Sequence, residues 1–225
     1  MLLAIDTATQ VMSLALHDGR SLLAEQTWHT ANNHTLELTQ GIHQMLARCG
    51  VDIAQVTALG VSVGPGSYSG LRVGVATAKG IAAVRGLPVI GVSALDTLAA
   101  AQPHVTQSSL IAVVQAGRER IVVGRYQWRK GRWGARGTMQ LMDWETLIAS
   151  VDGAVHVTGE VNEGGYEALR AAQERGVPIT LTPAVYRLRR AGFLAEEAWT
   201  RYHAAPSGFP ADRLVPIYIK TQDVP

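Results

Sequence analysis

The hydrophobic and polar positions of this sequence alternate first with the period of a β-strand and then with that of an α-helix. Three short apolar runs cover residues 2–6, 11–17 and 21–28, and Asp18-Gly19 between the last two is typical of a tight hairpin turn. These runs predict a three-stranded antiparallel meander at the start of the chain.

Helical periodicity follows the meander. Leu38, Ile42 and Met45 recur on one apolar stripe within residues 34–49. Further along, the pattern predicts a strand over 56–63, a helix from the end of a glycine-rich loop to about residue 84, a strand over 89–92 and a helix over 94–101. This order predicts a mixed sheet with helices, which is an α/β unit of the ribonuclease H type.

A second region begins near residue 108. We therefore divide the chain into an N-terminal lobe over 1–107 and a smaller C-terminal α/β lobe over 108–225. The elements predicted in the second lobe are strands over 110–115 and 120–128, a helix over 143–150, a strand over 154–158, a helix over 163–175, a strand over 178–181, a helix over 184–203 and a last strand over 215–219.

The composition favours a globular protein of the cytoplasm. Of the 225 residues, 47% are hydrophobic and 17% are charged, so part of the surface must be uncharged or covered by a partner. The sequence contains no apolar run long enough to cross a bilayer, and its opening lacks the basic segment of a signal peptide. The single cysteine, Cys49, fits a reducing compartment. We expect a cytoplasmic protein that does not associate with membranes.

Basic residues gather around the predicted hairpin of the second lobe, where Trp128 and Trp133 also lie. Such a segment could contact the backbone and the bases of RNA. Alternatively, the hairpin is solvated and its arginines pair locally. The candidate RNA contacts are Arg118, Arg120, Arg125, Arg129, Lys130 and Arg132, and Arg136 follows them.

The turn after the first strand, Asp6-Thr7-Ala8-Thr9, combines a carboxylate with two hydroxyl groups. Such a turn can hold a metal-bound phosphate, because hydroxyl and N–H groups bind its oxygens while the carboxylate binds the cation. Alternatively, this is a plain turn in which Asp6 accepts hydrogen bonds from the backbone. The candidate cofactor contacts here are Asp6, Thr7 and Thr9.

A glycine-rich loop, Gly64 to Gly70, stands between a predicted strand and a predicted helix. Its backbone N–H groups could bind an anion at the helix N-terminus, with Gly64, Gly66 and Ser67 as the candidate contacts. No Lys-Ser or Lys-Thr pair follows its last glycine, so it is not a Walker A loop. Alternatively, Gly and Pro permit a tight turn, and Ser67 or Ser69 caps the helix. The sequence leaves both interpretations open.

The helix after this loop is apolar on nearly all sides, which predicts that it is buried on more than one side. Small residues recur in it every four positions and would let another helix approach closely, from this chain or from another subunit. We expect a shared interface. The candidate partner contacts on this helix and on the helix over 34–49 are Thr35, Leu38, Ile42, Met45, Gly70, Leu71, Gly74, Val75, Ala78 and Ala82.

The sequence contains no recognisable catalytic centre. Its seven histidines are scattered without the spacing of a zinc pair on one helical face, and it has no Gly-x-Ser-x-Gly motif. We therefore expect neither a catalytic residue nor an intrinsic metal site.

The stretches over residues 3–9, 64–74 and 89–93 resemble the bacterial TsaB (YeaZ) family. This resemblance implies an actin-like ATPase or sugar-kinase fold with two ribonuclease H-like lobes and mixed sheets. It also implies a heterodimer with a TsaD-like catalytic homologue through helices 33–49 and 69–84, homodimers through the same helices, and a TsaE-like ATPase as a further partner.

The resemblance further implies a scaffold subunit without catalytic residues of its own. With TsaD and TsaE, such a subunit supports transfer of threonylcarbamoyl from threonylcarbamoyl-AMP to N6 of the adenosine next to the anticodon, in tRNAs that read codons beginning with A. Ala94 and Leu98 stand where TsaD carries two metal-binding histidines, and neither side chain can bind a metal. No intrinsic cofactor is implied, although ATP or ADP at the interface with partner subunits stays open. The alternative is a stand-alone nucleotide hydrolase or glycoprotease-like enzyme.

Overall fold

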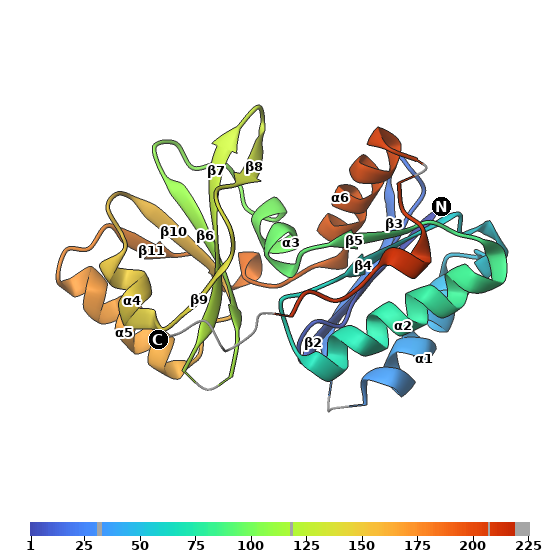
Figure 1. Cartoon of the computed structure of the whole chain (residues 1–225), viewed down its shortest axis with the longest axis horizontal. Helices are drawn as coiled ribbons and strands as arrows, with labels where there is room; N and C mark the ends of the chain where they lie inside the picture. The colour runs from blue at the N-terminus through green and yellow to red at the C-terminus, as the bar shows by residue number, and fades with distance from the viewer. Residues whose placement is uncertain (31–32, 118, 207, 219–225) are drawn as a thin grey trace. The chain divides into compact units, whose positions relative to one another are not determined.

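The computed structural model describes residues 1–30, 33–117, 119–206 and 208–218 of the chain. Within these residues the chain forms two compact units (Figure 1). The first unit contains residues 1–97 and 189–218, and the second contains residues 98–188.

The first unit is built on a five-stranded mixed sheet with the strand order β3-β2-β1-β4-β5. Strands β1, β2 and β3 pair antiparallel, which confirms the predicted meander, whereas β1, β4 and β5 run parallel to one another. The strands are β1 (Leu2–Asp6), β2 (Val11–His17), β3 (Leu22–His29), β4 (Ala58–Ser62) and β5 (Val89–Val92).

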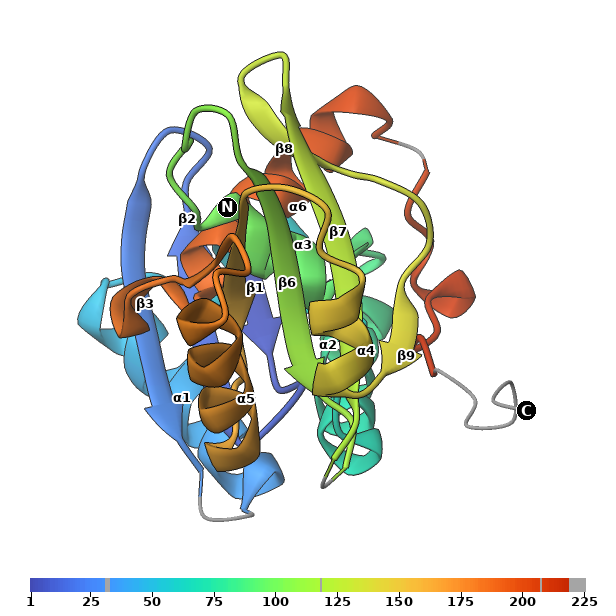
Figure 2. The ribbon, with the colours of Figure 1, turned by 90° about the vertical axis from the view of Figure 1, so that its left-hand side faces the viewer.

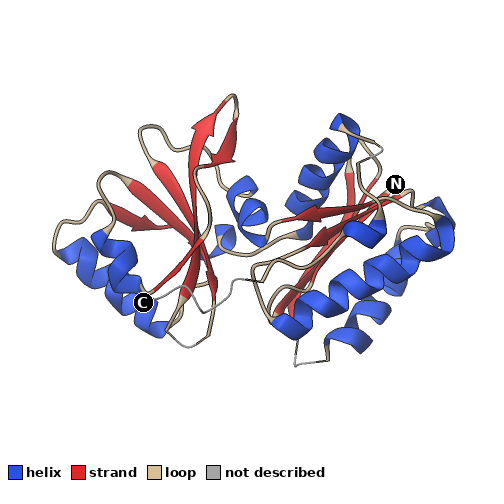
Figure 3. Ribbon diagram, in the orientation of Figure 1, coloured by secondary structure: helices blue, strands red, loops and turns tan. Residues whose placement is uncertain are grey.

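Helices cover both faces of this sheet (Figure 3). On one face, α1 (His34–Arg48) and α2 (Tyr68–Arg85) pack against Leu3 and Ile5 of β1. On the other face, α6 (Ala191–Ala204) packs against Leu2 and Ala4. Successive residues of a strand point to opposite faces, so β1 carries apolar side chains on both sides and is fully buried.

The division of the chain differs from the predicted boundary near residue 107, because residues 189–218 return to the first unit. Leu194 and Ala198 of α6 are fully buried against the first sheet. Gly60 of β4 leaves room for them, since an added Cβ there would lie 2.9 Å from the Ala198 methyl group. The predicted helix over 184–203 is also shorter at its start, where a 3-10 helix (Ala184–Tyr186) precedes α6.

The second unit has its own mixed sheet, in the order β11-β10-β6-β7-β8, and β9 pairs with β7. Figure 2 shows α4 and α5 in front of these strands. The elements are β6 (Ser109–Gln115), β7 (Ile121–Arg129), β8 (Arg132–Ala135), β9 (Gln140–Met142), α4 (Trp144–Ala149), β10 (Val155–Gly159), α5 (Glu163–Glu174) and β11 (Ile179–Leu181).

Three features differ from the predicted elements. The sequence pattern missed the short strands β8 and β9. The described part of the predicted strand over 215–219 is irregular, and its last residue lies outside the described residues.

The remaining elements are α3 (Ala94–Ala100) and two further 3-10 helices (Ile53–Gln55 and Ala211–Arg213). No helix in the described ranges is both long and apolar enough to span a membrane.

Candidate functional site

The turn after β1 and the glycine-rich loop before α2 lie directly against each other. The backbone N–H of Ser67 donates a hydrogen bond of 2.6 Å to the carbonyl oxygen of Ala8. A Cβ added at Gly66 would overlap the same carbonyl, and one added at Gly70 would overlap the carbonyl oxygen of Thr7. Glycine is therefore required at both positions because the loop backbone approaches the turn too closely for any side chain.

Two other candidate residues of the loop, Ser67 and Gly64, have different surroundings. Ser67 is exposed and caps α2, because its hydroxyl oxygen accepts a hydrogen bond from the N–H of Gly70. Gly64 has a positive φ and lies beside Leu71 and the backbone of Ile217, away from the turn. The capping role that the sequence offered for Ser67 is confirmed.

Thr7 is buried between the turn and α2. Its hydroxyl group donates a hydrogen bond of 2.7 Å to the carbonyl oxygen of Gly70. A Cβ at Gly74 would overlap the Thr7 hydroxyl oxygen, so the next turn of α2 also packs directly against this side chain. This hydroxyl joins the turn to the helix instead of facing solvent.

Asp6, at the end of β1, is 0% exposed and is held by groups of its own unit. One carboxylate oxygen accepts a hydrogen bond of 2.9 Å from the N–H of Ala8. The other oxygen lies 3.3 Å from Nε of Arg189, which is 2% exposed. A buried carboxylate needs such a cation, because removing an unpaired charge from water is costly.

Arg189 and His34 also hold Thr9, at the far end of the turn. A guanidinium N–H of Arg189 donates to the hydroxyl group of Thr9, and another contact of 3.4 Å reaches the carbonyl oxygen of Val11. Nε2 of His34 lies 3.0 Å from the carbonyl oxygen of Thr9. No sequence motif pointed to either residue, since Arg189 lies near the other end of the sequence and His34 belongs to no motif.

Five of the six candidate cofactor contacts thus meet at one place, and intramolecular bonds occupy the most buried of them. The guanidinium of Arg189 already places a positive charge beside the Asp6 carboxylate. In the described part of the chain, no group of three His, Cys, Asp or Glu side chains could hold a metal ion. Ala94 and Leu98 are buried apolar residues of α3.

The family of the chain follows from comparison with known proteins. Residues 23–156, more than half of the chain, match the family model described as TsaD: tRNA N6-adenosine threonylcarbamoyltransferase. The tRNA threonylcarbamoyladenosine biosynthesis protein TsaB of Bacillus subtilis is 30% identical over 161 residues, which cover 70% of this chain and 70% of that protein. The chain belongs to the TsaB (YeaZ) family. It is therefore a member of a family involved in the threonylcarbamoyladenosine modification of tRNA.

Solved structures show the same fold. YeaZ from Pseudomonas aeruginosa matches with a TM-score of 0.75 at 24% identity, over 97% of this chain and 99% of that chain. ROK hexokinase from Thermus thermophilus matches with a TM-score of 0.50 at 14% identity, over 91% of this chain and 99% of that chain. The predicted actin-like ATPase or sugar-kinase fold is confirmed, as is the resemblance to the TsaB family.

The structure changes the surface that the sequence assigned to a partner. Of the candidate partner contacts, Thr35 alone is exposed. The others lie in the core beneath α1 and α2 or against the Asp6–Thr9 turn: Leu38, Ile42, Met45, Gly70, Leu71, Gly74, Val75, Ala78 and Ala82. Their assignment as partner contacts is corrected, because the row of small residues lets α2 approach the turn of its own chain.

The outward side of α2 carries a second row with the same spacing of four residues. We call Arg72, Ala76, Gly80 and Val84 the outward row. All four are exposed, Val84 to 85%, and a Cβ added at Gly80 would meet nothing within 4 Å. Apart from Arg72, the row has no charge, although the solvent side of a surface helix usually carries several charged residues.

An aromatic cluster lies at the N-terminal end of the outward row. The guanidinium of Arg72 stands 3.8 Å from the centre of the Tyr68 ring, and its Nε donates a hydrogen bond of 3.3 Å to the hydroxyl group of Tyr218. The hydrogen bond to Tyr218 is the main reason why the pKa of Arg72 is raised above its ordinary value. Arg72 is therefore held as a fixed cation between two exposed tyrosines.

The basic candidates of the second unit do not form one cluster. Arg118 lies outside the described residues. Arg120 precedes β7, whereas Arg129, Lys130 and Arg132 lie around the turn at its other end, roughly 30 Å away for a nine-residue strand. Arg125 lies between them on β7, where it donates a hydrogen bond to the hydroxyl group of Ser150.

Proposed function

We propose that this chain is a non-catalytic scaffold subunit that binds a TsaD-like catalytic homologue through the outward row of α2 and the exposed start of α1. The observation that carries the proposal is the outward row itself, whose exposed residues Ala76, Gly80 and Val84 carry no charge. Small side chains there allow another helix to approach at the closest distances of helix packing, about 8 Å between axes.

The surroundings of the outward row suit an interface of ordinary size. Tyr68, Val84 and Leu36 of α1 are exposed to 56%, 85% and 61%. Aromatic and arginine side chains are common anchors of protein interfaces, so Tyr68 and Arg72 are the residues that we expect to contribute most. A specific interface needs about 800 Å² from each partner, which an 18-residue helix with its neighbours can supply.

In the proposed complex, this subunit orders the catalytic homologue and a TsaE-like ATPase. The complex transfers threonylcarbamoyl from threonylcarbamoyl-AMP to N6 of the adenosine next to the anticodon, in tRNAs that read codons beginning with A. The cytoplasm is the proposed location. ATP or ADP at the subunit interface would be held mainly by partner residues, because Asp6 and Thr7 are already bonded within this chain.

The same surface could pair two copies of this chain. A homodimer through the outward row would compete with the heterodimer, because both would cover Ala76 and Gly80. Adding the TsaD-like homologue should therefore convert homodimer into heterodimer in size-exclusion chromatography.

A stand-alone nucleotide hydrolase or glycoprotease-like enzyme is disfavoured. Either activity would need Asp6 or Thr7 to face a substrate. Both side chains are buried, and their partners are Arg189, Ala8 and Gly70.

A matched pair of substitutions tests the proposal. Gly80→Glu places a charge in the outward row, and Gly164→Glu places the same charge on the exposed side of α5 in the second unit. Both positions are helical and have open space for a side chain, so neither change should unfold the chain.

We expect Gly80→Glu to abolish co-purification with the TsaD-like homologue and to reduce reconstituted tRNA modification to the level seen when this chain is omitted. Gly164→Glu should leave both unchanged. Retention of the complex by Gly80→Glu, with a normal elution volume in size-exclusion chromatography, would refute the proposed docking surface.

A further inference from the structure

The β7–β8 hairpin separates its basic and aromatic side chains onto opposite faces. Ile121 and Val123 of β7 belong to the core under α4 and α5. Because side chains alternate along a strand, Arg125 and Arg129 lie on that same face of the sheet, whereas Trp128 lies on the other. The basic and aromatic groups that lie together in the sequence are therefore on different faces of the sheet.

The aromatic face of the hairpin is occupied within the second unit. The rings of Trp128 and His104 stack with centres 4.5 Å apart, and Trp133 meets Trp128 edge-on at 5.4 Å. Nε1 of Trp133 donates a hydrogen bond of 3.1 Å to the carbonyl oxygen of Gln102. These contacts hold the loop after α3 on the hairpin, so the tryptophans are not free platforms for bases.

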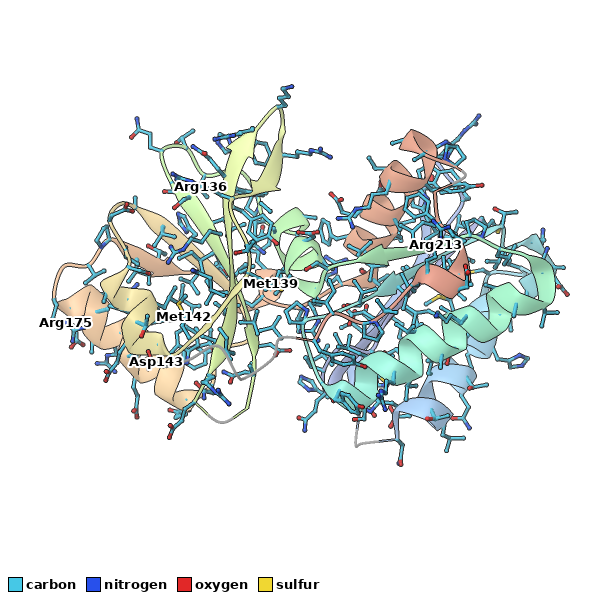
Figure 4. All side chains as sticks on the ribbon, in the orientation of Figure 1. Arg136, Met139, Met142, Asp143, Arg175 and Arg213 are labelled. Atoms are coloured by element: carbon cyan, nitrogen blue, oxygen red, sulfur yellow. The ribbon has the colours of Figure 1, made fainter. Side chains whose placement is uncertain are left out.

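The basic face carries two arginine pairs. In each pair, one arginine lies directly opposite the other on the neighbouring strand of the hairpin. Arg129 is the cross-strand partner of Arg132. The N–H of Arg136 donates to the carbonyl oxygen of Arg125, which continues the same register just past β8 and sets this second pair side by side. The pairs lie four residues apart on β7, or about 13 Å. Figure 4 labels Arg136 at this end of the unit.

Like charges directly opposite each other destabilise a pair of strands. No acidic residue nearby in the sequence can offset this repulsion, since no Asp or Glu occurs between Glu119 and Asp143. The observed partners of this face are neutral: Arg129 donates to the side-chain oxygen of Gln127 at 2.8 Å, and Arg125 donates to Ser150. A polyanion laid along the face would neutralise all four guanidinium groups.

We propose that this basic face, made of Arg125, Arg129, Lys130, Arg132 and Arg136, binds the phosphate backbone of RNA. The inference rests on the proposed function, in which a tRNA is the substrate of the complex. With the tryptophans turned away, the face has no aromatic side chain on which a base could stack, and its contacts to phosphate groups should dominate. Binding should therefore depend little on sequence and strongly on salt, as expected for contacts to phosphate groups.

The test uses the full chain alone and a fluorescently labelled, unmodified tRNA transcript. Fluorescence anisotropy between 50 and 200 mM salt gives the affinity and its salt dependence. The variant is Arg132→Glu with Arg136→Glu, which places a carboxylate opposite Arg129 and another opposite Arg125. Arg170→Glu with Arg175→Glu is the control, because it changes the net charge equally at the end of α5, next to β11 at the other edge of the sheet.

We expect the hairpin variant to lose at least tenfold in tRNA affinity at 50 mM salt, and its slope of log K against log salt to flatten by about two. Its thermal midpoint should not fall, because each new carboxylate faces an arginine. The control should match the wild type within about twofold. Equal affinity and slope for the hairpin variant and the wild type, or no tRNA binding by the wild type, would overturn the proposal.

The outcome can be separated from that of the proposed function. The hairpin variant should still co-purify with the TsaD-like homologue, and Gly80→Glu should still bind tRNA as the isolated chain. Loss of partner binding in the hairpin variant would show that the face contacts protein and would overturn the RNA assignment.

Discussion

Replacing Arg189 by methionine should destabilise the first unit far more than its loss of packing would suggest. Methionine keeps much of the apolar volume of the arginine stem but removes the guanidinium that lies 3.3 Å from the Asp6 carboxylate. Asp6 is 0% exposed, so its charge would remain in the core without this cation. Breaking a buried ion pair in this way typically costs about 3–5 kcal/mol.

The companion variant decides whether the charge is the cause. In Asp6→Asn with Arg189→Met, the asparagine oxygen can still accept the hydrogen bond from Ala8, and no charge is left in the core. We expect this double variant to lie within about 2 kcal/mol of the wild type, because replacing both partners of a buried pair is often nearly neutral. The double variant should therefore be more stable than Arg189→Met alone by at least about 1 kcal/mol, although it carries one more substitution.

Urea and thermal unfolding measure the stability of both variants. For a chain of this length, a loss of 3–5 kcal/mol corresponds to a fall of roughly 6–20 °C in the thermal midpoint. A second scan adds Mg-ATP or Mg-ADP to the wild-type chain, where we expect no shift because Arg189 already places a positive charge beside the Asp6 carboxylate. A cost below about 1 kcal/mol for Arg189→Met, or stabilisation of the isolated wild type by Mg-nucleotide, would refute the reasoning.

Two further predictions concern α2 and α4. Gly74→Ala should destabilise the chain by about 1–3 kcal/mol, because the added Cβ would overlap the Thr7 hydroxyl group. Gly80→Ala in the same helix should stabilise the chain by up to about 1 kcal/mol, because the added Cβ meets nothing within 4 Å. Urea unfolding of both variants measures these two changes. The pKa of Asp143, which caps α4, is lowered from 3.8 mainly by the N–H of Thr146. Its contribution to stability is therefore present above that value and is lost as the pH falls through the lower folded-state pKa, so stability below pH 4 should fall less steeply in Asp143→Asn. An equally steep fall would contradict this role.

The sequence was sufficient to predict the first sheet because its evidence is local. The apolar run over 2–6, the alternation over 11–17 and the Asp18-Gly19 turn after it predict the strands and their antiparallel pairing. The pattern could not assign α6 to a unit, because an apolar stripe shows that a helix is buried but not which sheet it covers. Strand β8 was missed because Arg132 to Ala135 has no apolar alternation and is formed by pairing with β7.

The sequence predicted where the candidate site lies, but not which groups its residues contact. The spacing of small residues on α2 is the same for Gly70, Gly74 and Ala78 as for Ala76 and Gly80, so periodicity alone cannot tell which row faces inward. In the structure, the row that contains Gly70 faces inward, and the hydroxyl group of Thr7 donates a hydrogen bond to the carbonyl oxygen of Gly70. The partner of Asp6 was equally hidden, because nothing in the local sequence links Arg189 to the first turn.

These contacts give the Asp6–Thr9 turn a structural role in this chain. The Asp6–Thr9 turn is bonded to α2 through Thr7, to α1 through His34, and to the segment leading into α6 through Arg189. It therefore fixes three helices around the end of β1. Since α2 carries the outward row, the geometry of the proposed docking surface depends on a largely buried turn that lies outside this row. We infer that substitutions in this turn will weaken partner binding in proportion to their loss of stability, whereas substitutions in the outward row will weaken it without such a loss.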